Sequence, residues 1–380
     1  MTDAGADTAT LPTGDRPAGT VAVASQWRLM WWKFRRHKLA VAGLVTVLAL
    51  YLIALFAEFV APFDPNAFNR RGGFHPPQAV HFWDRTEDGM SFQPFVYATD
   101  RTRDPVTLAT TYVRTDEKIP LRWFGQGEPY MMWGLIPASR HLLTTADPDE
   151  MFYLIGADRL GRDMLSRTIH GARLSLSIGL VGVAFALVLG VSLGGASGYF
   201  GGRTDTVIQR IVEFTLSLPT IPVWLALAAA LPPAWPMPLR YFVITLIVSL
   251  VGWTELARVV RGRFLSLKNE DFVIAARLDG ASEARIIFRH MLPSLTSHII
   301  ASVTLAIPLM ILAETALSFL GLGLMPPAIS WGVLLKEAQD VRSIVLGPWL
   351  FAPGAAVVIT VLAFNFLGDG LRDAADPYAP

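Results

Sequence analysis

Cysteine is absent from this 380-residue sequence, and charged residues make up only 17% of it. Without cysteine the chain can form no disulfide, no thiolate metal site and no cysteine nucleophile. The sequence contains no HExxH and no GxxxxGK[ST] pattern, and its 7 histidines have no metal-ligand spacing. We therefore expect no catalytic residue, no metal and no cofactor on this chain. The net charge of +1 gives no indication of nucleic-acid binding.

Apolar residues dominate instead, at 52% of the chain, with a mean hydropathy of +0.43. Such a composition is typical of a membrane protein rather than a soluble enzyme. A helix that crosses a bilayer needs about 20 apolar residues. Runs of that length lie at residues 39–59, 174–196, 208–231, 241–260, 294–317 and 348–367. The sequence thus predicts an all-α polytopic membrane protein with six transmembrane helices, the first within a segment at residues 27–61.

Charge distribution predicts the orientation of these spans. A basic, aromatic cluster at residues 31–38 comes just before the first run, which places the amino terminus in the cytoplasm. Residues 27–37 are equally compatible with an amphipathic helix on the membrane surface. Six spans return the carboxyl terminus to the cytoplasm. Residues 1–26 have the composition of a disordered tail, and residues 374–380 form a second short tail.

A long segment at residues 62–156 separates the first two spans, and we expect a small β-rich extracytoplasmic insert there. Two strand-like runs flank Glu87-Asp88-Gly89, which is a turn signal. Long loops are translocated largely regardless of charge, so its arginines do not oppose this placement. The insert is rich in aromatic residues, which form either its core or a platform for a ligand or partner: Trp83, Phe95, Tyr112, Trp123 and Trp133.

Residues 269–293, here called the polar hairpin, lie between two apolar runs. Good helix formers occupy residues 270–278, with Phe272, Ala275 and Ala276 on one side. Gly280 breaks this helix, Ser282 caps a second one, and Pro293 ends it. Small residues at Ala275, Ala276, Gly280 and Ala281 would admit a partner's backbone. The alternative to a partner-binding role is that the polar hairpin is an ordinary polar connector between two membrane helices.

Aspartate and arginine alternate with small residues just before the second apolar run. The residues concerned are Asp158, Gly161, Arg162, Asp163, Ser166, Arg167, Gly171 and Arg173. Opposite charges at the mouth of a span can pair and fix how the helix enters the membrane. We favour that structural role over direct contact with a substrate.

Ionisable residues inside spans are costly, so Glu314 in the fifth run is informative. It either lines a translocation path, with a role in gating, or accepts an interhelical hydrogen bond. Pro219, Pro222 and Pro308 indicate kinks beside such a path.

One competing pattern points to a different class of protein. Residues 195–198 read Gly-Ala-Ser-Gly, like the GxSG of rhomboid-type intramembrane proteases, and His298 lies on another span. Small residues at the end of a span are more simply a packing and turn signal. A passive, ATP-independent channel is a further alternative, but it leaves the polar hairpin without a role.

Three segments, at residues 156–176, 269–293 and 313–327, resemble ATP-binding-cassette importer permeases of the dipeptide/oligopeptide/nickel family, specifically the second, C-type subunit. In the family loop an alanine pair is followed by a glycine and a terminal Leu-Pro. The matching ATPase-coupling residues are Phe272, Ala275, Ala276, Arg277, Gly280, Ala281, Ser282, Arg285, Leu292 and Pro293. Ile274 departs from the pattern, because the family usually has glutamate there, so no glutamate role is transferred.

This resemblance implies a type I importer permease fold over residues 157–373, with a cytoplasmic coupling loop at residues 263–293. It implies a homologous permease, two ATPase subunits or domains that hold ATP and Mg²⁺, and an extracytoplasmic solute-binding protein as partners, in lipid of the bacterial inner membrane. The implied activity is ATP-driven import of peptides, or of nickel complexes, oligosaccharides or opine-like solutes. The loop would couple ATPase motion to alternating access.

Overall fold

The computed structural model describes residues 26–375, except residues 87–88, 104, 106–109, 148–149 and 233. The tail expected at residues 1–26 lies almost wholly outside the described residues, as do residues 376–380 and part of the turn expected around Gly89.

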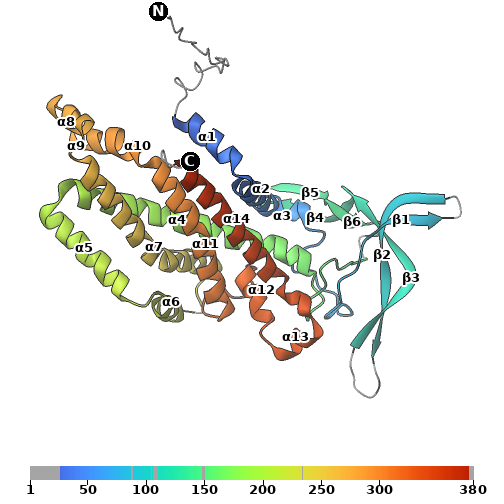
Figure 1. The fold of residues 1–380 in the computed structure, drawn as a ribbon. Helices are drawn as coiled ribbons and strands as arrows, with labels where there is room; N and C mark the ends of the chain where they lie inside the picture. Colours follow the sequence, from blue (N-terminus) through green and yellow to red (C-terminus); the bar gives the residue numbers. More distant parts are fainter. Residues whose placement is uncertain are drawn as a thin grey trace, which may run out of the picture.

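The described chain is mostly helical (Figure 1). The longest helices are α2 (Lys38–Leu55), α4 (Met164–Phe200), α7 (Met237–Leu267), α11 (Thr296–Phe319) and α14 (Ala352–Ala375). Among the residues that the structure describes, five helical segments are long and apolar enough to cross a membrane, and a sixth is added if α5 (Gly202–Ser217) and α6 (Thr220–Ala229) form one broken span. The expected polytopic helical class is therefore confirmed.

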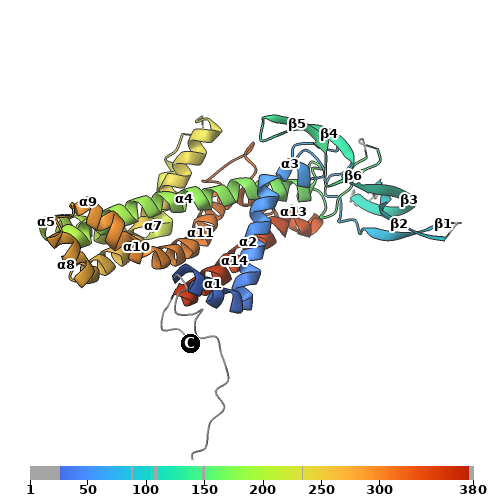
Figure 2. The ribbon, with the colours of Figure 1, turned by 90° about the horizontal axis from the view of Figure 1, so that it is seen from above.

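The central helix is α4, which packs against α2, α7 and α11, while α14 packs on α2 and α11 (Figures 1 and 2). Glycine permits the closest of these approaches, as expected for helices in lipid. A Cβ atom at Gly43 on α2 would lie 2.6 Å from the carbonyl oxygen of Ala363 on α14. Helix α1 (Gln26–Arg36), where the sequence allowed an amphipathic helix, packs against α14.

The third span differs from the expected single helix at residues 208–231. Helices α5 and α6 meet at an angle of 85°. Leu218, between them, has extended backbone angles, and Pro219 caps α6. A proline disfavours the helical conformation of the residue before it, so the break follows from Pro219. Pro308, by contrast, lies inside α11, which continues through it.

The insert contains an antiparallel sheet and a separate hairpin. The sheet has the order β1-β2-β3-β6, from β1 (His81–Thr86), β2 (Gly89–Arg103), β3 (Thr110–Trp123) and β6 (Leu143–Thr145). Thr86 pairs with Gly89, so the expected hairpin is confirmed. Strands β4 (Gln126–Met132) and β5 (Ile136–Arg140) form the separate hairpin.

The aromatic residues of the insert are divided between its core and its surface. Phe95 is buried, which agrees with the core interpretation. That interpretation is wrong for Trp83, Trp123 and Trp133, whose exposed fractions are 60%, 50% and 43%. Tyr112 is half-buried, and its hydroxyl donates to backbone carbonyls of the segment that precedes the sheet.

Several short helices connect the long ones. Sequence patterns did not predict α12 (Trp331–Glu337) and α13 (Val341–Leu346), which lie between α11 and α14. A one-turn helix, α3 (Ala57–Val60), follows α2, and a 3-10 turn (Pro348–Phe351) leads into α14. The polar hairpin consists of α8 (Asp271–Leu278), α9 (Glu283–Arg285), a π-helical stretch (Ile286–Met291) and α10 (Leu292–Ser294). The polar hairpin and the insert lie at opposite ends of the molecule (Figure 1).

Candidate functional site

The polar hairpin has the turn that its sequence predicts. Helix α8 ends before Gly280, whose φ of +75° is a left-handed conformation that favours glycine. The Ser282 hydroxyl then accepts a hydrogen bond from the backbone N–H of Arg285, at 3.4 Å, and so caps the second helix.

The buried face of α8 differs from the expected one. Val273 and Ala276 are buried and pack with Phe264 of α7 and Met291 of the π-helical stretch. Phe272 and Ala275, expected on the same side as Ala276, are exposed. They point away because residues 273 and 276 are one helical turn apart, and this pair faces α7.

An apolar surface is left on the outside of α8. Phe272, Ile274 and Leu278 are 42%, 44% and 83% exposed. Arg277 and Arg285, two of the matched loop residues, are also exposed. A surface of large apolar side chains with arginine beside them is typical of a protein interface rather than of a solvated turn.

Pro293 does not end the second helix, contrary to expectation. The helical path continues as α10, where Pro293 lies in the first turn. In a regular α-helix its ring would clash with the carbonyl of the residue four positions earlier. The wider π-helical turn immediately before it relieves that clash.

The base of the hairpin is tied to the turn between α4 and α5 by a cluster that sequence reasoning missed. Arg261 of α7 donates two hydrogen bonds to Asp205 of α5, both at 2.6 Å. Ser197 donates to the same carboxylate and accepts from Gln209. Lys268 donates to the backbone carbonyl of Tyr199 at 2.7 Å. The serine of the protease-like Gly-Ala-Ser-Gly pattern is therefore held in this structural cluster.

At the other end of α4, the expected pairing of aspartate and arginine is present. Arg162 donates to Asp158 at 2.5 Å and to Glu337 at 3.0 Å. Arg167 lies 3.8 Å from Asp158 and 3.4 Å from Glu337. We call Asp158, Arg162, Arg167 and Glu337 the Asp/Arg cluster. Sequence reasoning missed Glu337, which lies on α12 and joins that helix to the start of α4.

The remaining motif residues fix the first turn of α4. Asp163 is its N-cap and accepts hydrogen bonds from the backbone N–H and hydroxyl of Ser166, at 2.7 Å and 2.6 Å. Burial raises the pKa of Asp163 to about 6, although the bonds from Ser166 oppose this rise. Gly161 has a φ of +76°, and Gly171 lies against Trp331.

Arg173 connects α4 to the end of α2. Its guanidinium pairs with Glu58 at 2.6 Å and donates to the carbonyls of Ala54 and Leu55, at 3.0 Å and 3.1 Å. Helix ends leave carbonyls without intrahelical partners, so these bonds satisfy the end of the first span.

Glu314 is fully buried and accepts hydrogen bonds from three serine hydroxyls, Ser318 at 2.8 Å, Ser330 at 2.9 Å and Ser175 at 3.3 Å. Each serine in turn accepts a backbone N–H, from Leu324, Val333 and Trp331 respectively. The carboxyl thus joins α4, α11 and the loop before α12. This geometry favours the interhelical interpretation of Glu314.

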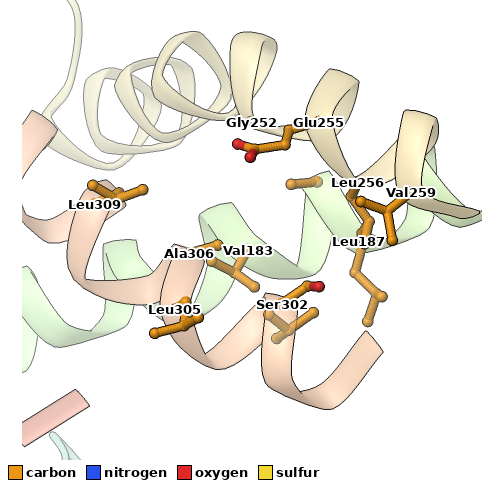
Figure 3. Close-up of a pocket in the computed structure, with 12 residues that line it drawn as sticks. Val183, Leu187, Gly252, Glu255, Leu256, Val259, Ser302, Leu305, Ala306 and Leu309 are labelled. Atoms are coloured by element: carbon orange, nitrogen blue, oxygen red, sulfur yellow. The ribbon is translucent and has the colours of Figure 1, made fainter. Parts of the chain in front are cut away.

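A cavity of about 220 Å³ lies between α4, α7 and α11 (Figure 3). Its walls are mostly aliphatic, and Glu255 and Ser302 are the residues that bring a carboxylate and a hydroxyl to it. A second cavity of about 570 Å³ shares Glu255 and also contacts Arg258 and Trp224, so it extends toward α5 and α6. Glu314 lines neither cavity.

Known protein families match most of the chain. The family described as binding-protein-dependent transport system inner membrane component matches residues 186–378. The N-terminal transmembrane domain of oligopeptide transport permease C matches residues 25–77.

Individual relatives agree with these matches. The oligopeptide transport system permease protein OppC of Bacillus subtilis (strain 168) is 30% identical over 93% of this chain and 90% of its own length. The dipeptide transport system permease protein DppC of the same organism is 40% identical over 60% of this chain and 70% of its own length. The DppC protein of Alkalihalophilus pseudofirmus is 30% identical over 96% of this chain and 94% of its own length.

Proposed function

Because this chain belongs to the family of binding-protein-dependent transport system inner membrane components, as a permease subunit of an ATP-binding-cassette importer, we propose that it imports peptides or similar small solutes. The substrate class rests on the oligopeptide and dipeptide names of its relatives. The chain itself is a multi-pass inner-membrane protein whose part is translocation.

The exposed apolar surface of α8 carries the proposal. Leu278 is 83% exposed although leucine is normally buried, and Ile274, one helical turn earlier on the same side of α8, is 44% exposed. An ATPase subunit that covers this surface would bury it. Two such partners would hold ATP and Mg²⁺, and their closure on ATP would move α8.

Motion of α8 would reach the spans as rigid-body motion. Val273 and Ala276 pack on α7, and Arg261 of α7 holds Asp205 of α5 with two hydrogen bonds. Packed helices slide or rotate as units rather than bend continuously. We infer that this contact carries the movement of α8 to the α5–α6 pair, beside the cavity that Glu255 lines.

The orientation follows from charge. Arg258, Arg261, Arg263 and Lys268 surround the end of α7 that leads into the polar hairpin, so this end faces the cytoplasm. Both chain termini then lie on the cytoplasmic side, and the insert lies outside. The exposed Trp83 and Trp123 of the insert provide a surface for a solute-binding protein. A homologous permease would complete the path across the larger cavity.

A substitution at the apolar surface of α8 tests this proposal. The chain is purified from its own membranes in mild detergent, as the natural protein and as Leu278→Glu, and the co-purifying proteins are identified by mass spectrometry. Gly280→Glu, which places a charged side chain in the turn, is a second variant. Val341→Glu is the control, because Val341 is 73% exposed but lies on α13.

We expect a second permease and ATPase subunits with the natural chain and with Val341→Glu, and loss of the ATPase alone with Leu278→Glu. ATP-dependent uptake of a labelled peptide into vesicles should be lost in parallel. Recovery of the natural chain without any ATPase would contradict the proposal and favour the channel or protease alternatives. Peptide uptake without ATP would favour the channel.

A further inference from the structure

The β4–β5 hairpin ends in an apolar tip. Residues 129–138, Pro-Tyr-Met-Met-Trp-Gly-Leu-Ile-Pro-Ala, contain no charged residue. At the tip, Leu135 is 76% exposed, Ile136 51% and Met131 50%. Trp133 and Gly134 both have positive φ, which makes the tight turn that projects these side chains. This is the uncharged end of the insert.

The tip is attached to the end of the first span. The indole N–H of Trp133 donates to the carbonyl of Leu55, the last residue of α2, at 2.7 Å. The Trp133 ring also packs against Phe56, with centroids 5.9 Å apart. Figure 2 shows β4 and β5 beside α3, whereas β1 to β3 extend away from the helices. The tip therefore lies at the level where α2 leaves the membrane.

Lipid is the occupant that fits this position. Leu48, Leu52 and Leu55 of α2 are about half exposed and form a membrane-facing surface that continues to the tip. Tryptophan is enriched where hydrocarbon meets headgroups. A two-stranded hairpin is marginally stable alone in water, so its apolar residues need another surface. The polar Glu58–Arg173 pair, one turn beyond Leu55, marks where the headgroup layer begins.

The ribbon formed by β2 and β3 provides a contrast within the insert. The far end of the β2–β3 ribbon carries exposed charged residues, Arg101, Arg103, Arg114 and Asp116. Such residues require water. The β2–β3 ribbon and the β4–β5 hairpin thus have surfaces of opposite character, although both belong to the insert.

We propose that the β4–β5 tip inserts its apolar side chains into the lipid leaflet on the insert's side of the membrane. Leu135, Ile136 and Met131 lie among the acyl chains, and Trp133 lies at their boundary with the headgroups. The hairpin so anchored holds the insert at a fixed height and angle against the end of α2. This inference requires only that α2 spans the membrane, so it is independent of the substrate and of the ATPase contact.

Spin labelling tests the proposal directly, because the natural chain has no cysteine and each introduced cysteine is unique within it. The natural chain with its co-purifying subunits, labelled in the same way, gives the background signal from the other subunits. The full chain carrying Leu135→Cys, with the subunits that co-purify, is labelled with a nitroxide and reconstituted into liposomes. Collision with oxygen, which concentrates in lipid, is compared with collision with a water-soluble nickel chelate. Leu48→Cys on α2 is the lipid control, and Val113→Cys on β3 is the water control.

We expect the label at Leu135 to collide more with oxygen than with the chelate, as at Leu48 and opposite to Val113. Ile136→Cys is a second, independent variant and should agree. A chelate preference like that of Val113 would overturn the proposal. Low collision with both reagents would also overturn it, because the tip would then be covered by a protein such as a solute-binding protein or second permease.

Discussion

The two ends of this molecule differ in how their charged residues are placed: they are buried and paired at one end and exposed at the other. At the start of α4, the Asp/Arg cluster is largely closed within the chain: the buried Asp158 accepts a hydrogen bond from Arg162, and the buried Arg167 forms ion pairs with Asp158 and Glu337. In the polar hairpin, Arg277 and Arg285 are exposed beside the apolar Leu278. Buried charges are tolerated only when paired, whereas an exposed apolar surface is normally covered by a partner. The Asp/Arg cluster therefore holds α4 and α12 together, whereas the polar hairpin offers a surface for contact with a partner.

Removal of a carboxylate from the Asp/Arg cluster should have the largest effect. Asp158→Ala leaves Arg162 and Arg167 sharing only Glu337, and loss of one partner from a buried ion pair costs about 3–5 kcal/mol. We expect a large fall in the thermal unfolding temperature in detergent. Glu213→Ala is the matched control, because its ion pair with Arg210 is exposed and contributes about 1 kcal/mol or less. Equal shifts for both variants would mean that the cluster is not a structural joint.

Glu314 lies at the centre of a second buried polar cluster, near the carboxyl end of α11. Glu314→Gln replaces one of the two carboxyl oxygens with an amide NH₂ group, so only one oxygen remains to accept hydrogen bonds from the serine hydroxyls. We expect the lost hydrogen bond to cost about 1–3 kcal/mol of stability. We expect assembly to persist while the coupling of ATP hydrolysis to uptake falls, because the loop before α12 is held less firmly. Unchanged coupling in this variant would remove the gating role. Glu255→Gln, in the cavity, is the comparison.

A pair of substitutions on α8 distinguishes the role of its buried face in stability from the role of its exposed face in binding the ATPase. Val273→Ala opens space under a fully buried side chain and should destabilise the chain by about 1–2 kcal/mol. Leu278→Ala, at an exposed position, should change stability by about 0.5 kcal/mol or less but weaken ATPase association. Thermal unfolding and co-purification measured on both variants check this difference. The contact-surface interpretation fails if Leu278→Ala retains the ATPase as well as the natural chain does.

The last expected effect concerns pH. The pKa of Asp163 is about 6 in the folded chain, above its ordinary value of 3.8, so the folded state binds more protons between these values. Stability from this group is therefore present at low pH and is lost as pH rises from about 4 to 6. Asp163→Asn keeps an N-cap acceptor but cannot ionise. From about pH 4 to 6, the unfolding temperature of Asp163→Asn should fall less than that of the natural chain. If the unfolding temperatures of the two proteins change with pH in the same way, Asp163 does not have a raised pKa.

Local signals accounted for much of the fold. Apolar run length predicted the spans, a turn signal predicted the β1–β2 hairpin, and Gly280 with Ser282 predicted the break and the cap in the polar hairpin. The same reasoning failed for Pro293 and for the face of α8. In both cases the outcome depended on how neighbouring turns and α7 pack, and not on the preference of one residue.

The sequence by itself determined that the chain enters a membrane, which segments form most of its long helices, and which residues are polar where burial is costly. Only the tertiary structure decided how those polar residues are satisfied. Arg162 donates a hydrogen bond to Glu337, which is 175 positions away in the sequence, and Glu314 accepts one from Ser175, which is 139 positions away. Helix and turn preferences act over a few neighbouring residues, so sequence patterns predict them. Ion pairs and hydrogen bonds between distant residues exist only after the helices have packed, and packing is a property of the whole chain.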